Sequence, residues 1–188
     1  MTRCYNTLDI SMGGFSMKKI IDPFDYAGEI SKRMKPGILL TTKAEGMVNT
    51  MTIGWGTIGV EWSRPVFVAY VRESRFTREL LDKNPEFTVN IPVETIDGKI
   101  IGFCGAKSGR DLDKIMELGL HLEEPQEISV PGIKELPLTL ECKVIYRNPQ
   151  PVDGLPQEIL ERYYPEQNGK RDAHIAYYGE IVSAYIIE

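Results

Sequence analysis

The sequence predicts a mainly β protein, an antiparallel barrel into which helices are inserted. Short runs of β-branched and aromatic residues are separated by turn-forming residues, a pattern typical of strands joined by tight turns. Helix-like segments lie between some of these runs, which favours a barrel with insertions over a parallel doubly wound sheet. Gly102, Gly105 and Gly109 lack the spacing of a glycine-rich loop after a strand, which disfavours a Rossmann or Walker site.

The first half of the chain predicts strands with one helix between them. Two β-rich runs flank the turn residues Ala44, Glu45 and Gly46, and this arrangement indicates a hairpin. Pro92 marks the end of a later strand, because proline cannot donate to a sheet. In chain order, we expect strands at residues 38–42, 49–55, 66–72 and 86–92, and a helix at residues 77–84.

The second half predicts two helices, a loop and a strand-rich C-terminus. Apolar residues recur at helical spacing over residues 95–104. A second helix is expected to begin at Ser108, three residues before an acid as in a capping box, and to end at Gly119. The remaining expectations are a loop at residues 123–137, a strand at 138–146, a helical turn at 158–164 and one or two strands at 175–187, interrupted at Gly179.

Length and composition predict one domain. The chain has 188 residues and 42% apolar composition, enough for one well-buried core. We expect the domain to span residues 20–188, after a poorly ordered N-terminal lead at residues 1–19. No apolar run approaches the roughly 20 residues of a membrane span, and we expect a cytoplasmic protein.

The net charge and the small number of potential metal ligands argue against several classes of protein. The net charge of −5, with no basic blocks, argues against a nucleic-acid or anionic-membrane binder, so any anion site must be local. Three scattered cysteines form no CxxC pair, and only two histidines are present. Neither a disulfide framework nor a metal site is therefore expected.

One segment combines the features of an anion site. Arg72, Ser74, Arg75 and Thr77 follow a predicted strand and lead into a predicted helix. The first N–H groups of a helix are unpaired, and arginine supplies charge-assisted donors. Hydrogen bonds to charged groups are worth about 1.5–3 kcal/mol each, against about 0.3–1 kcal/mol for the helix dipole, so the arginines should dominate affinity. A capped surface helix beside two solvated arginines is the alternative.

Several segments in order resemble the flavin reductase-like family, and within it the flavoredoxins. The resemblance runs from about Lys35 to the C-terminus, and it implies an FMN-binding split barrel. The segments that carry it are Asn49–Trp55, Arg72–Thr77, Glu86–Pro92, Cys104–Gly105, Ser108–Lys114, Ala173–His174 and Gly179–Val182.

The resemblance implies roles for particular residues. It places the isoalloxazine ring of FMN along residues 49–52, and the FMN phosphate at the anion segment that was inferred above from local chemistry. It also implies a homodimer in which a second loop faces the cofactor of the neighbouring subunit. The cofactor-binding residues expected on this basis are Asn49, Thr50, Met51, Thr52, Trp55, Arg72, Ser74, Arg75, Phe76, Thr77, Cys104, Ser108, Gly109 and Asp111.

Four residues have alternative interpretations. His174 corresponds to a family histidine near the nicotinamide, although a lone histidine beside a strand is more often structural, and Ala173 stands where relatives carry aspartate. Cys104 is more typical of a small buried apolar group than of a flavin-facing thiol. Trp55 could shield the edge of the flavin ring, or it could equally lie in the core or in a dimer interface. Lys114 is expected to form surface pairs.

The function implied is that of an FMN oxidoreductase. It would accept hydride from NADH or NADPH and reduce free flavin, a metal complex or a redox protein. An FMN electron carrier without a nicotinamide site, and a barrel-shaped binding module without flavin, remain the alternatives.

Overall fold

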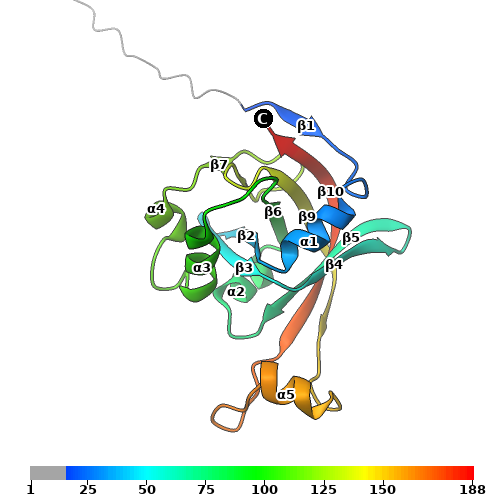
Figure 1. Ribbon diagram of the computed structural model, residues 1–188, viewed down its shortest axis with the longest axis vertical. Helices are drawn as coiled ribbons and strands as arrows, with labels where there is room; N and C mark the ends of the chain where they lie inside the picture. Colours follow the sequence, from blue (N-terminus) through cyan, green and yellow to red (C-terminus); the bar gives the residue numbers. More distant parts are fainter. Residues whose placement is uncertain (1–15) are drawn as a thin grey trace, which may run out of the picture.

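The computed structural model describes residues 16–188, which form a curved antiparallel sheet with helices on its outside and at one end (Figure 1). Its strands are β1 (Lys18–Ile20), β2 (Ile38–Ala44), β3 (Met47–Ile53), β4 (Gly56–Glu61), β5 (Arg64–Arg72), β6 (Glu86–Ile91), β7 (Leu122–Glu123), β8 (Gly132–Ile133), β9 (Leu138–Pro149) and β10 (His174–Ile187). Its helices are α1 (Ala27–Met34), α2 (Phe76–Lys83), α3 (Gly98–Ala106), α4 (Lys114–Leu118) and α5 (Gln157–Tyr163).

The main sheet has the strand order β3-β2-β6-β9-β10-β5-β4, and β1 pairs with β10. Its strand pairs are antiparallel, and β7 and β8 form a separate small sheet. Because the sheet curves, β3 near one end contacts β5 near the other. This is a split barrel, so the predicted fold class is confirmed.

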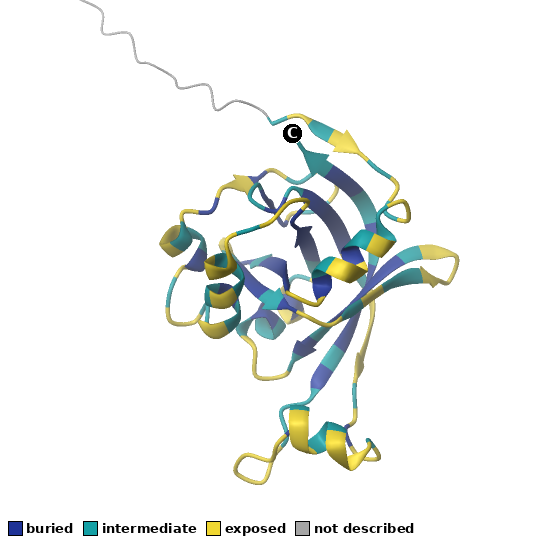
Figure 2. Cartoon of the chain, in the orientation of Figure 1, coloured by how far each residue is buried: buried dark blue, intermediate teal, exposed yellow. Residues whose placement is uncertain are grey.

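The main core fills the inside of the barrel. Figure 2 shows buried residues, in dark blue, along the barrel strands. Ile30 and Met34 of α1 belong to the same core. A second cluster joins Leu39 of β2 to Cys104 of α3, to Ile133 of β8 and to Leu136 in the loop before β9. The barrel wall next to α3 is therefore covered on both faces, which supports the loop that precedes α4.

Local sequence explains several boundaries of helices and strands, and the structure corrects one predicted helix start. Glu45 and Gly46 have positive φ and form the predicted hairpin turn between β2 and β3. Gly119 ends α4 at φ 60°, as expected. The helix predicted to begin at Ser108 instead begins at Lys114. The carboxylate of Asp113 caps it by accepting the N–H groups of Ile115 and Met116, whereas the Ser108 hydroxyl accepts the Arg110 N–H within a turn.

The strand β4 and the helix α1 are absent from the sequence prediction. β4 carries two glycines and little alternation, and α1 is short, so neither produces a strong pattern. At the N-terminus, Lys18 and Lys19 of the predicted lead pair with the C-terminal residues of β10. The rest of that prediction, for residues 1–15, lies outside the described residues.

A long excursion between β9 and β10 projects from the barrel (Figure 1). We call residues 150–173, which include α5, the arm. The backbone N–H of Gln150 donates to the carbonyl of His174 at 2.8 Å, so both ends of the arm lie together. The chain therefore enters and leaves the arm at the same place, next to His174 at the start of β10.

Gly179 marks a register shift in β10, which continues as one strand rather than being interrupted. A Cβ at this position would lie 2.5 Å from Phe87 Cζ and 2.8 Å from Cys142 Cβ, and both neighbours are fully buried. The glycine is therefore required by close packing in the barrel core.

We predict that Gly179→Ala lowers the free energy of unfolding by about 1–3 kcal/mol, the usual range for overpacking. Urea denaturation of both proteins measures the difference. Gly59→Ala in β4 is the matched control, because a Cβ there meets nothing within 4 Å. Equal effects of the two substitutions would contradict a packing origin.

Candidate functional site

Three cavities adjoin the loop between β5 and α2, and Arg75 lines all of them. The β3 cavity, of about 160 Å³, lies beside residues 51–55 and reaches His174. The α2 cavity, of about 100 Å³, lies at the start of α2 and reaches Lys114. The arm cavity, of about 910 Å³, lies between this loop and the arm. A ligand could therefore extend from β3 to α2 or to the arm.

The cavities bring together most of the residues that the sequence singled out. Thirteen of them line the three cavities, whereas Thr50 and Asp111 do not. Thr50 is fully buried and bonds to Thr41 and to the carbonyl of Leu40 inside the barrel wall. Asp111 lines a neighbouring depression, which shares Asn49, Gly109 and Lys114 with the α2 cavity. The thirteen are Asn49, Met51, Thr52, Trp55, Arg72, Ser74, Arg75, Phe76, Thr77, Cys104, Ser108, Gly109 and His174.

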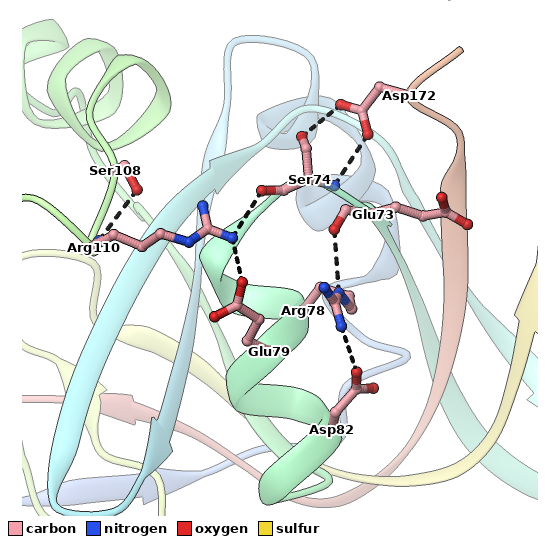
Figure 3. A network of polar contacts seen from close by, with 8 residues as sticks. All are labelled: Glu73, Ser74, Arg78, Glu79, Asp82, Ser108, Arg110 and Asp172. Atoms are coloured by element: carbon pink, nitrogen blue, oxygen red, sulfur yellow. Dashed lines mark hydrogen bonds and ion pairs between the residues drawn. The ribbon is translucent and has the colours of Figure 1, made fainter. Parts of the chain in front are cut away.

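Two members of the predicted anion segment hold the arm. The Ser74 N–H and hydroxyl donate to the two carboxylate oxygens of Asp172 at 3.1 and 2.6 Å, as Figure 3 shows. The Arg72 guanidinium donates to the carbonyls of Asp172 and Tyr163 at 2.6 and 2.8 Å. A carboxylate thus occupies the donors of Ser74, which shows that this loop binds an anionic oxygen pair.

The other two members face the α2 cavity. Arg75 is the N-cap residue of α2 and makes no side-chain cap. Within the described part of the chain, its guanidinium donates only to the carbonyl of Gly105, at 3.3 Å. The Thr77 hydroxyl accepts from the Asn49 amide at 3.0 Å and ties β3 to the helix start. Arg75 therefore remains able to bind an anion at the end of a helix, where the dipole favours negative charge.

Lys114 is a site residue that the sequence interpretation missed. Only 4% of its surface is exposed, and Nζ donates to the carbonyls of Cys104 and Lys107 at 3.3 and 3.2 Å. It forms no ion pair within residues 16–188. Burial lowers its pKa, and Arg75 lowers it further. A buried cation without a carboxylate beside an arginine is an arrangement that an anionic ligand would stabilise.

The α2 cavity also contains an unsatisfied polar atom. Asn49 Oδ1 is buried and has no hydrogen-bond partner among residues 16–188. A Cβ at Gly109 would lie 2.1 Å from this oxygen, so position 109 must be glycine for the loop to approach β3. A buried amide oxygen without a partner costs about 1–3 kcal/mol, which indicates a position where a hydrogen-bonding ligand would be favourable.

His174 lies at the opposite end of the site, in the β3 cavity. It is 5% exposed, its Nδ1 lies 2.9 Å from the Tyr164 hydroxyl, and its ring centroid lies 5.0 Å from that of Trp55. Burial and then Arg72 lower the pKa of His174 to about 4, although Asp172 opposes the shift. The imidazole is therefore neutral near pH 7 and can donate or accept a hydrogen bond at its second nitrogen.

The remaining sequence candidates have simpler environments. Cys104 is buried in the second core cluster, and burial raises the pKa of its thiol, so it is a protonated apolar group at the cavity wall. Within residues 16–188, no group of three or more histidine, cysteine or acidic side chains is arranged to hold a metal ion. No helix in this part of the chain has the length and apolar character needed to cross a membrane.

Sequence comparison matches most of the chain to one family model. Residues 32–188 match the sequence model described as "Flavin reductase like domain". An uncharacterized protein of Archaeoglobus fulgidus is 33% identical over 98 residues, which are 52% of this chain and 54% of that protein. The match thus spans about half the length of that curated relative.

Solved structures share the fold. Flavoredoxin from Methanosarcina acetivorans is 27% identical, with a TM-score of 0.60 over 82% of this chain and 69% of that one. Flavoredoxin of Desulfovibrio vulgaris (Miyazaki F) is 20% identical, with a TM-score of 0.61 over 82% of this chain and 70% of that one.

Proposed function

Because this chain belongs to the flavin reductase-like family, we propose that it binds FMN, accepts hydride from NADH or NADPH, and passes the electrons to an acceptor. The observation that carries the proposal is the pairing of Arg75 with buried Lys114 at the start of α2, beside the β3 cavity. Neither cation has a carboxylate partner within the described residues. The pair fits the phosphate of FMN.

The donors and acceptors of the site match the two ends of FMN. Arg75, Lys114 and the first turn of α2 would hold the phosphate, because they combine two charges with free helix N–H groups. The wall formed by Met51, Thr52 and the residues up to Trp55 would accommodate the ring. Arg72 and Ser74 would contribute less to phosphate binding than the sequence predicts, because both already donate hydrogen bonds to the arm.

Bound FMN supplies a ring that accepts a hydride and releases electrons one or two at a time. The chain's own residues would bind FMN, orient the nicotinamide and shield the site from water. Trp55 and Tyr164 pack around His174 and limit the access of water to that end of the β3 cavity. The neutral His174 would orient the nicotinamide amide by a hydrogen bond, while Tyr164 fixes the imidazole through Nδ1.

The similarity to flavoredoxin supports a second candidate, an FMN electron carrier that a partner protein reduces. The two candidates share the cofactor site and differ only in whether a nicotinamide site exists.

The visible spectrum of the purified protein tests the proposal. Protein that has been mixed with FMN and dialysed should be yellow, and anaerobic NADH or NADPH should bleach it rapidly. His174→Ala should retain its colour and bleach more slowly, because only hydride transfer uses that residue. Yellow protein that neither nucleotide bleaches would favour the electron carrier. Colourless protein would contradict FMN binding and favour a binding module without flavin.

We further propose that the functional unit is a homodimer. Trp62, Tyr146 and Tyr178 form an aromatic cluster on the outside of the sheet, with ring centroids 5.2–6.1 Å apart. Trp62 is 54% exposed and has φ 50° in the β4–β5 turn, a backbone conformation unfavourable for a bulky residue. An exposed tryptophan in a strained turn supports a role in binding, and a second copy of this aromatic surface would cover it.

We predict that Trp62→Arg shifts the FMN-loaded protein from dimer to monomer at micromolar concentration, because two copies would place like charges in an apolar interface. Sedimentation velocity measures the shift. Met17→Arg, at an exposed apolar residue beside β1, is the matched control and should remain dimeric. A parent protein that is monomeric would contradict the proposal directly.

A further inference from the structure

The arm cavity is the largest of the three site cavities, and the FMN site proposed above uses the β3 and α2 cavities instead. It lies between the loop before α2 and the arm, and is lined on one side by Arg72, Arg75 and Arg78 and on the other by Lys170 and Arg171. The volume of about 910 Å³ is within the range of cavities that bind small molecules. Its wall is shared by two segments that lie far apart in the sequence, the loop before α2 and the arm.

The lining is basic in a chain that is acidic overall. Five basic and two acidic side chains line the arm cavity, while the chain carries a net charge of −5. Arg75 and Lys170 form no ion pair within residues 16–188. Arg78 pairs with Asp82 and Arg171 with Glu166, while Arg72 donates to the carbonyls of Asp172 and Tyr163. Unpaired cations that converge on one cavity favour an anionic ligand.

The two acidic side chains of the cavity reduce the positive charge of its lining without cancelling it. The Asp172 carboxylate accepts both the N–H and the hydroxyl of Ser74, so its oxygens are already hydrogen-bonded (Figure 3). In the same view, the Glu73 carbonyl accepts from Arg78 and its carboxylate points away from the other side chains shown. Asp172 therefore acts mainly as the tether that holds the arm against the loop.

The arm cavity adjoins the end of the β3 cavity where His174 lies. Arg72 and Arg75 line both, and His174 follows Asp172 by two residues. Tyr163 lines the arm cavity and contacts Trp55 at a centroid distance of 5.2 Å. An elongated ligand could place one ring beside His174 and its phosphate groups among the cations. A second ring of the same ligand could then contact the edge of Tyr163.

We propose that the arm cavity binds the phosphate-bearing adenosine half of the nicotinamide nucleotide, and that Lys170 makes the protein prefer NADPH to NADH. This inference rests on the proposed function, since it places the hydride donor of that reaction. The extra phosphate of NADPH adds about two negative charges near pH 7, which an unpaired lysine attracts. Lys170 is exposed and its side chain forms no hydrogen bond among the described residues, so its replacement should leave the fold intact.

Calorimetric titration of the FMN-loaded protein with adenosine 2′,5′-bisphosphate and with ADP tests the proposal without any hydride transfer. The first probe carries the extra phosphate of NADPH, and the second resembles the adenosine half of NADH. Lys170→Ala should weaken the binding of the first by about tenfold, the loss of one charged hydrogen bond, and leave ADP little changed. Lys32→Ala, at an exposed lysine of α1, is the matched control.

The outcomes separate this inference from the proposed function. Equal binding of the bisphosphate to the parent and Lys170→Ala, or no binding of either probe to the parent, would overturn the inference even if NADPH bleaches the flavin. Selective weakening in Lys170→Ala together with a flavin that no nicotinamide nucleotide bleaches would support the nucleotide site and contradict the reductase function.

Discussion

Replacing Lys114 by methionine is expected to weaken FMN binding by about 1.5–3 kcal/mol, the strength of a hydrogen bond to a charged group, while leaving the FMN-free protein at least as stable as the parent. The two effects differ in sign because the lysine is buried without a carboxylate partner in the described chain. Methionine fills a similar volume and removes the desolvated charge.

Two measurements on Lys114→Met separate binding from stability. Titration with FMN and riboflavin shows whether the loss depends on the phosphate, and urea denaturation of FMN-free protein measures the free energy of unfolding. Lys99→Met, at an exposed lysine of α3, is the control for removing a charge. Equal losses for FMN and riboflavin would show that Lys114 does not contact the phosphate. A destabilised FMN-free protein would assign the lysine a structural role.

Acidification is expected to remove about 3 kcal/mol of stability through His174 alone. Its pKa of about 4 in the folded protein lies below the ordinary value of 6.5, so the unfolded chain binds more protons between these pH values. Stability from this group is therefore full above about pH 6.5 and is lost as the pH falls through about 4. Each unit of pKa difference corresponds to about 1.4 kcal/mol.

Urea denaturation at both ends of this pH window, in the parent and in His174→Gln, isolates the contribution. Glutamine cannot ionise, so the variant should lose less stability on acidification, while the carboxylates affect both proteins alike. The exposed His121 provides the control substitution His121→Gln. Parallel pH dependence of the parent and His174→Gln would show that burial does not hold His174 neutral.

The sequence predicted those parts of the protein that depend on local chemistry. Gly46 and Gly119 adopt the positive φ values that their turn and helix-end positions required. The anion segment and the β3 residues were predicted to meet, and Arg75, Thr77 and Asn49 do line one cavity. The turn conformations are properties of short stretches of chain, whereas the meeting of the anion segment with β3 followed from the resemblance to the family.

The parts that were not predicted depend on contacts between distant residues. Ser74 and Asp172 are separated by 98 positions. The sequence around Ser74 gives no signal that its hydroxyl will donate to a carboxylate of the arm. Lys114 was expected to form surface pairs because it follows Arg110 by four residues on the predicted helix. In the structure it is buried, and its Nζ donates to the carbonyls of Cys104 and Lys107. Burial of a charge is decided by the tertiary structure, so its sequence signal is weak.

The arm also has a consequence for local opening of the protein. Its middle contains α5, which has no buried residue, and its principal ties to the barrel are the contacts of Tyr164, Asp172 and Ala173 with the residues around Arg72. Such a segment forms a small cooperative unit whose opening free energy lies below that of global unfolding. Amide hydrogen exchange should therefore be faster in the arm than in β9 and β10 next to it, and a ligand that bridges loop and arm should slow that exchange.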